Sequence, residues 1–283
     1  MKLSFQLKKG AVEFSPVEHA VVLKYFEILQ KEFPGLCAWI SDTEIEKVKF
    51  YWAPVLDSDS GIIGCWDPST PNSCYISPVE YMSYAASMNM HPEFNLASYL
   101  KDPEAYMRLN LVFGEEERPL VMLHEFYHRW QFRTAPIFYI FNRLITAFID
   151  NGLVDRLVYV IKDFFRKDKI MNPVEEEECH LPWLYDFTLE ADCDKNTDQN
   201  PQIREFTTKL SEAWGYYCRY TENNFKAAKM KAVGHTSYES SRSMASCQAD
   251  CLNEYDKSII KYVADMYDLL TEGAVKDYVY IKK

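Results

Sequence analysis

The chain has 283 residues, a formal net charge of -11 at pH 7, and 48% hydrophobic residues. A chain of this length can bury one sizeable core and can form one domain or two. No Lys/Arg cluster is long enough to neutralise a run of phosphates, which argues against nucleic acid or a strongly anionic membrane as a partner. The aromatic residues, 20 Tyr, 17 Phe and 6 Trp, supply broad core and groove surfaces.

The N-terminal residues 1–10 include lysines but no apolar stretch of the length that a signal peptide needs. The most apolar stretch, 136–165, is interrupted by polar and charged residues, which argues against a bilayer span. The 8 cysteines include no CxxC pair, and reduced thiols are the default in a chain without a signal peptide. We therefore expect a protein of the cytoplasm or of a soluble particle.

The first 77 residues predict one capped helix followed by a small sheet. Ser15-Pro16-Val17-Glu18 is typical of a capping box with Pro at the first helical position, and it opens a helix to about Phe33. Short β-type runs, divided by Asp, Ser, Gly and Pro, then predict a sheet of three or four strands. These runs are 37–40, 48–52, 62–66 and 74–76.

After Pro78 the pattern is helical to the end of the chain. Helices are expected at 79–89, 96–107, from Pro119 to about Ala135, and at 137–151, 153–167, 182–196, 201–232 and 238–272. The acidic residues 175–178 are a linker candidate. The predicted fold class is α+β: a domain of residues 1–200, with a helical C-terminal extension, 201–283, packed on the same domain.

A short motif, His124-Glu125-Phe126-Tyr127-His128, has the spacing of a zinc site. Residues four apart on a helix lie one turn above each other, so the two imidazoles face a single point. Glu125 lies beside them and can accept the proton of a nucleophilic water. Apolar flanks predict that this helix is buried, and buried His and Glu side chains need a compensating partner such as a cation. The motif therefore predicts a zinc ion, with Glu125 as general base.

A catalytic zinc needs a third protein ligand and an open position. The metzincin extension would place Gly at 131 and His at 134, but the chain has Gln131 and Thr134, which excludes that subclass. The best-placed carboxylate is Glu190, on a predicted helix. Rival third ligands stay open: Asp192, His180 or one of Glu175 to Glu178.

The HExxH helix, followed by Glu190 and by Asp194 four residues later, resembles the gluzincin family of zinc metallopeptidases. The resemblance covers roughly residues 36–195. It implies a zincin-like fold, Glu190 as the third ligand, Asp194 as an outer partner of a ligand histidine, and a small sheet whose edge strand lines the substrate cleft. Thr188 stands where a more compact ExxAD variant would have its ligand Glu, which leaves the register of this helix open.

The expected activity is hydrolysis of peptide bonds by a zinc metallopeptidase, with a peptide or protein substrate paired to an edge strand near 74–76. Gln131 lies on the metal-facing side, and Tyr216, Tyr220 and His235 are candidate donors to an oxyanion. One alternative is a non-catalytic structural or assembly protein, such as one of a virus particle, that keeps the fold and metal and binds a protein partner through its C-terminal helices. A second is a helical binding module in which the motif is accidental.

Overall fold

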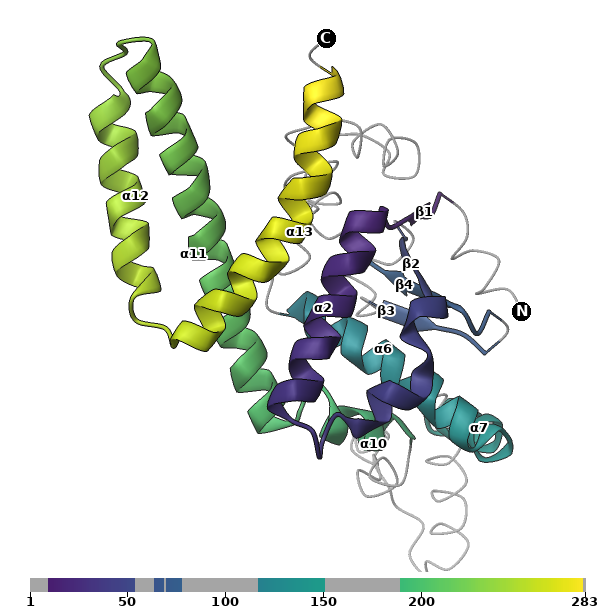
Figure 1. Cartoon of the computed structure of the whole chain (residues 1–283). Helices are drawn as coiled ribbons and strands as arrows, with labels where there is room; N and C mark the ends of the chain where they lie inside the picture. The colour runs from purple at the N-terminus through teal and green to yellow at the C-terminus, as the bar shows by residue number, and fades with distance from the viewer. Residues whose placement is uncertain (1–9, 54–63, 69, 78–116, 151–188, 282–283) are drawn as a thin grey trace, which may run out of the picture.

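The computed structural model describes residues 10–53, 64–68, 70–77, 117–150 and 189–281 (Figure 1). It is mostly helical, with a small four-stranded mixed sheet near the N-terminus, which confirms the α+β class. The described elements are β1 (Val12–Glu13), α2 (Pro16–Glu32), the 3-10 helices η1 (Ala38–Thr43) and η2 (Ile45–Lys47), β2 (Lys49–Trp52), β3 (Gly64–Trp66), β4 (Ser73–Ile76), α6 (Glu117–Thr134), α7 (Pro136–Asp150), α10 (Leu189–Asn196), α11 (Pro201–Ala232), α12 (Tyr238–Leu252) and α13 (Lys257–Ile281). The helices predicted at 79–89, 96–107 and 153–167 lie outside the described residues.

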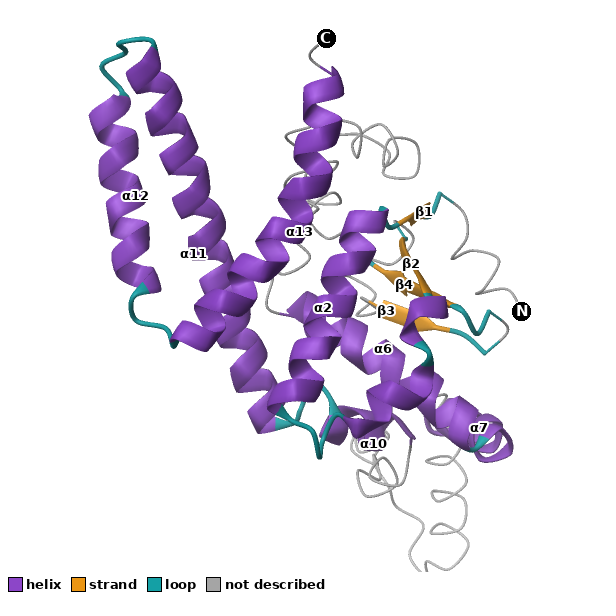
Figure 2. Cartoon of the chain, in the orientation of Figure 1, coloured by secondary structure: helices purple, strands orange, loops and turns teal. Residues whose placement is uncertain are grey.

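The sheet has the strand order β1-β2-β4-β3 (Figure 2). β3 and β4 form an antiparallel hairpin, and β4 then pairs in parallel with β2, so that Phe50 lies opposite Cys74. The predicted edge strand near 74–76 is not β4 itself, because β4 is paired on both sides. β3 is the last strand in the order, and spacing along the chain does not reveal this, since a hairpin can join a sheet by either of its strands.

The capping box that opens α2 is confirmed. The Glu18 backbone N–H donates to Ser15 Oγ at 3.2 Å, and the Ser15 N–H donates to the Glu18 carboxylate at 2.6 Å. The indole N–H of Trp52 donates to the same carboxylate at 2.9 Å, and this hydrogen bond links the start of α2 to β2. Burial raises the pKa of Glu18 against the lowering effect of these hydrogen bonds.

The prediction of a strand at 37–40 is wrong, because residues 38–43 form η1. Trp39 and Ile40 are buried by packing against α6 and α2 rather than by a ladder, and Thr43 Oγ1 donates to the Ile40 carbonyl to close the turn. A four-residue apolar run does not distinguish a buried turn from a strand.

The prediction of α11 at 201–232 is confirmed, whereas the single helix predicted at 238–272 is two helices. The polar residues 253–256 form the break between α12 and α13. α13 then continues through Gly273 to Ile281. One Gly lowers helix stability by about 1 kcal/mol, which is too little to end a helix of this length.

The core lies between the sheet and the helices. α2 and α6 pack on one face of the sheet. α13 packs against α2 (Figure 1). Side chains of α11 and α13, including Trp214 and Val263, belong to the same buried cluster as those of α2 and α6. The α11–α12 hairpin projects away from this body. Within the described ranges, no helix has the length and apolar character needed to cross a membrane.

Candidate metal centre

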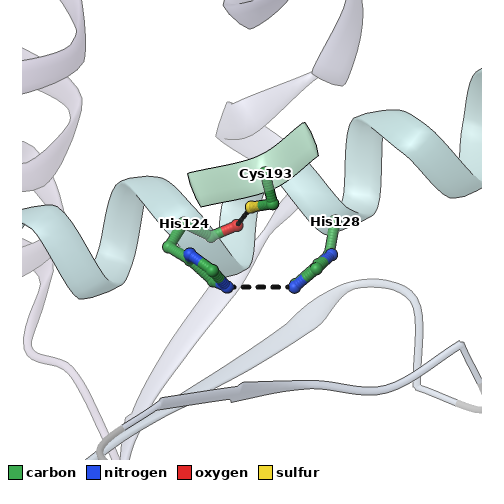
Figure 3. A group of neighbouring side chains, drawn as sticks. All are labelled: His124, His128 and Cys193. Carbon is green, nitrogen blue, oxygen red and sulfur yellow. Dashed lines mark hydrogen bonds between the residues drawn. The ribbon is translucent and has the colours of Figure 1, made fainter. Parts of the chain in front are cut away.

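Three electron-pair donors from two helices converge on one point. The Nε2 atoms of His124 and His128, both on α6, are 3.1 Å apart (Figure 3). Oε2 of Glu190, on α10, lies 2.7 Å from His128 Nε2 and 3.4 Å from His124 Nε2. Ligand atoms at about 2.0–2.1 Å from a tetrahedral zinc are separated from each other by about 3.3 Å. The donor set and its spacing therefore fit a zinc ion.

α10 is held against α6 and α7 by hydrogen bonds at its first turns. Asn142 of α7 is buried and accepts the Leu189 backbone N–H at 2.8 Å, which satisfies one of the unpaired donors at the start of α10. The Cys193 thiol lies 3.2 Å from the His124 carbonyl oxygen, to which it donates (Figure 3). Because Glu190 and Cys193 are three residues apart, this contact turns the carboxylate toward the two imidazoles.

Cys193 is itself a possible metal ligand. One ligand atom from each of His124, His128 and Cys193 lies within 4.8 Å of the other two. Glu190 is the better placed candidate for a third ligand, because its oxygen is at ligand spacing from both Nε2 atoms, whereas the thiol is fully buried and directed to a backbone carbonyl.

Each histidine ring is also held at its other nitrogen. His124 Nδ1 lies 3.2 Å from Asp198 Oδ1 and 3.4 Å from Asp194 Oδ1. His128 Nδ1 lies 2.9 Å from Gln131 Oε1. Outer partners of this kind fix the orientation of a ligand imidazole and raise its basicity.

Burial opposes a positive charge on His124, but its hydrogen bonds to Asp198, Cys193 and Glu190 raise its pKa overall. The pKa of His128 is likewise raised, because its contacts with Cys193 and Glu190 outweigh burial. A metal ion at this point would therefore have to compete with protons for the two imidazoles.

Glu125 is placed by β3. The Trp66 backbone N–H donates to Glu125 Oε2 at 2.7 Å. A Cβ at Gly64 would collide with Val121 Cγ1 and lie 2.9 Å from Glu125 Cγ, so only glycine lets β3 approach α6 this closely. Burial raises the pKa of Glu125, and the nearby charge of Glu190 adds to this shift against the lowering effect of both imidazoles.

The structure does not bring every predicted residue to this site. Asp192 Oδ2 accepts from Tyr127 Oη at 3.2 Å and from Gln131 Nε2 at 2.9 Å, so Asp192 contacts the residues around the ligands and not the point between the two imidazoles. The other rivals, His180 and Glu175 to Glu178, lie outside the described residues. Thr188 is also outside them.

The three candidate oxyanion donors lie in the C-terminal helical part of the chain. Tyr216 packs against Tyr255 and Tyr220 against Tyr217. His235 lies in the turn between α11 and α12, at the end of the hairpin far from α10 (Figure 1), and its Nδ1 accepts the Ser237 N–H at 3.2 Å. These contacts place none of the three beside α6.

Sequence reasoning missed Asp198, Cys193, and the Trp66 amide. A signal for Asp198 was present, because Glu190, Asp194 and Asp198 recur at intervals of four residues. It also missed Tyr139 of α7, a buried residue whose ring lies 6.2 Å from that of His128, centroid to centroid, in an edge-on contact.

Fold and site together define an α+β protein with a candidate three-donor metal centre between two helices. Comparison with known proteins adds no family to this description, since no protein-family model, no curated protein and no solved structure matches the chain.

Proposed function

We propose that the protein is a zinc-dependent hydrolase of peptide bonds with a zincin-like fold of the gluzincin type. The observation that carries this proposal is the convergence of His124 Nε2, His128 Nε2 and Glu190 Oε2 within 2.7–3.4 Å of one another. Both rings have their Nδ1 atoms directed to acceptors, which leaves three lone-pair donors facing each other. A metal cation at this point would be a ligand partner for all three atoms at once.

In the proposed mechanism, zinc bound at this point supplies Lewis acidity, which lowers the pKa of water and polarises a carbonyl. Glu125 accepts the proton of the attacking water and delivers it to the leaving amine. The Trp66 amide holds one oxygen of Glu125, so that the other is available for this transfer. The raised pKa of Glu125 brings it closer to the operating pH, which suits a group that must both take and release a proton.

The substrate would be an extended peptide. Among the strands that the structure describes, β3 is the last in the order, and it lies beside Glu125, so a peptide paired with its outer side would lie next to the proposed general base. We therefore propose β3, and not β4, as the strand that would pair with a substrate.

One observation favours the alternative of a structural or assembly protein. The α11–α12 hairpin projects from the body and exposes large apolar side chains, with Phe225 70%, Val233 71% and Met244 54% exposed. Exposed apolar side chains on a projecting element are typical of a protein-binding surface. Such a role is compatible with a retained metal site, with or without hydrolysis.

The test separates these functions. Glu125→Gln is nearly isosteric, so the protein should fold and bind zinc like the parent but lose cleavage of a mixed peptide library followed by mass spectrometry. Glu222→Gln, at an exposed ion pair with Lys226 on α11, is the matched control and should cleave normally. A parent that binds zinc and cleaves nothing supports the structural role, and equal cleavage by Glu125→Gln would refute the role of Glu125.

A further inference from the structure

The side chain of Gln131 lies between α6 and α10 and is 5% exposed. Its Oε1 atom is 2.9 Å from His128 Nδ1. Its Nε2 atom is 2.9 Å from the Leu189 carbonyl oxygen and 2.9 Å from Asp192 Oδ2. One amide therefore links a candidate metal ligand to the first turn of the helix that carries Glu190.

The chemistry of these partners allows only one orientation of the Gln131 amide. The Leu189 carbonyl and the Asp192 carboxylate accept hydrogen bonds and have no proton to donate, so the NH₂ group must face them. Its two hydrogens match these two acceptors. The opposite orientation would direct the amide oxygen at two other oxygens in a partly buried site, where none of the three can supply a proton to another. Asp192 Oδ2 would then keep only the hydrogen bond from Tyr127 Oη.

The fixed amide in turn fixes the proton on His128. Oε1 of Gln131 only accepts, so His128 Nδ1 must donate, and a neutral imidazole with its proton on Nδ1 has its lone pair on Nε2. That lone pair faces His124 Nε2 at 3.1 Å and Glu190 Oε2 at 2.7 Å. A neutral ring with its proton on Nε2 would instead direct that proton at the centre of the site.

We propose that Gln131 is a positioning residue that holds His128 in the tautomer able to bind metal, and that Asp192 acts through Gln131. This proposal rests on the proposed zinc site. It gives Asp192 a role other than that of a ligand: its Oδ2 accepts from both Gln131 Nε2 and Tyr127 Oη, which orients the amide from the α10 side. Leu189 supplies the second acceptor through its backbone, which no side-chain substitution removes.

Two substitutions follow from this chain of contacts. Gln131→Leu keeps a similar volume but removes the acceptor of the His128 proton, and zinc affinity should fall by about 10- to 100-fold. Asp192→Asn keeps the size of an exposed residue but offers an NH₂ group that can donate to the oxygen of a flipped Gln131 amide. The loss of zinc affinity should be smaller in Asp192→Asn than in Gln131→Leu, because the Leu189 carbonyl still selects the native orientation of the amide. Asn196→Ala is the control, since Asn196 contacts Asp192 but not Gln131.

The experiment measures zinc affinity by chelator competition and the ring protons of zinc-loaded, ¹⁵N-labelled protein by NMR. The parent should show a slowly exchanging proton on His128 Nδ1, with Nε2 unprotonated, and Asn196→Ala should match it. In Gln131→Leu that proton should exchange rapidly, and the order of affinities should be parent, Asp192→Asn, Gln131→Leu. Thermal unfolding separates this effect from loss of fold. If Gln131→Leu does not fold, Asp192→Asn, which changes an exposed residue, still tests the proposal, because its zinc affinity should be lower than that of the parent.

Two negative results have different meanings. A parent that binds no zinc overturns the proposed function, and with it the need for a fixed tautomer. A parent that binds zinc while Gln131→Leu and Asp192→Asn match it in affinity and in proton exchange overturns only the role given to Gln131 and Asp192.

Discussion

Replacing Gly64 tests the contact between β3 and the helix of the candidate site. An added Cβ would collide with Val121 Cγ1 and lie 2.9 Å from Glu125 Cγ and 3.0 Å from Glu125 Oε1. Carbon atoms in contact are normally about 3.5–4.0 Å apart, so β3 or α6 must shift by more than about half an ångström. Overpacking of this kind costs about 1–3 kcal/mol. We therefore expect Gly64→Ala to lower the free energy of unfolding by that amount.

The assay is urea denaturation of the metal-free protein, compared with Gly35→Ala as a control. A Cβ at Gly35 meets nothing within 4 Å, so this substitution should change the free energy of unfolding by less than about 0.5 kcal/mol. The double variant Gly64→Ala/Val121→Ala removes the collision with Val121 Cγ1 and leaves the close contacts with Glu125. It should be more stable than the sum of the single effects predicts, by at least about 0.5 kcal/mol.

Zinc affinity should change little in Gly64→Ala, because the three proposed ligands lie on α6 and α10. Additive effects in the double-mutant cycle, or equal stability of Gly64→Ala and Gly35→Ala, would refute the close approach of β3 to α6.

Three further predictions concern the metal site. Glu190→Ala should lower zinc affinity by more than about 100-fold while α10 persists, because Ala is a better helix former; circular dichroism and metal titration check both, and parent-like affinity would rule out Glu190 as a ligand. Zinc affinity should rise with pH and binding should release protons, because the pKa values of His124 and His128 are raised in the metal-free protein; calorimetry in buffers of different ionisation enthalpy measures this release, and pH-independent affinity would contradict it. Asp198→Ala should weaken zinc binding by about 10- to 100-fold and more than Asp194→Ala, because Asp198 lies closer to His124 Nδ1; the reverse order would return the outer role to Asp194.

Local sequence rules predicted the parts of the fold that local chemistry decides. The capping box of Ser15 and Glu18 fixed the start of α2, and Pro201 marked the start of α11, because each depends on hydrogen bonding or backbone geometry within one turn. The strand at 37–40 and the unbroken helix at 238–272 were wrong for the opposite reason. Burial of Trp39 and the break at 253–256 depend on contacts with other elements and on turns that propensity does not resolve.

The candidate site divides in the same way. The spacing of His124 and His128 places both rings on one helical face, whatever the rest of the chain does. The groups around the motif come from segments that are distant in sequence. β3 approaches Glu125, and the turn before α11 brings Asp198 to His124. Their roles follow only from the packing of α10 on α6, which no single segment of sequence encodes.

Gln131 illustrates the limit most clearly. Its position three residues after His128 places it on the same side of α6, but its function depends on which amide atom faces the ring. That orientation is set by Leu189 and Asp192, about sixty residues further along the chain. Spacing predicts that the two side chains are neighbours, whereas the direction of the hydrogen bond needs the structure.

The most direct test of the account is the metal content of the protein purified without added zinc and without chelators. Elemental analysis should give about one zinc per chain in the parent, since two imidazoles and a carboxylate at ligand spacing bind zinc strongly near neutral pH. The double variant His124→Ala/His128→Ala should contain none. A parent that is well folded, metal-free and unable to take up zinc on titration would contradict the central claim.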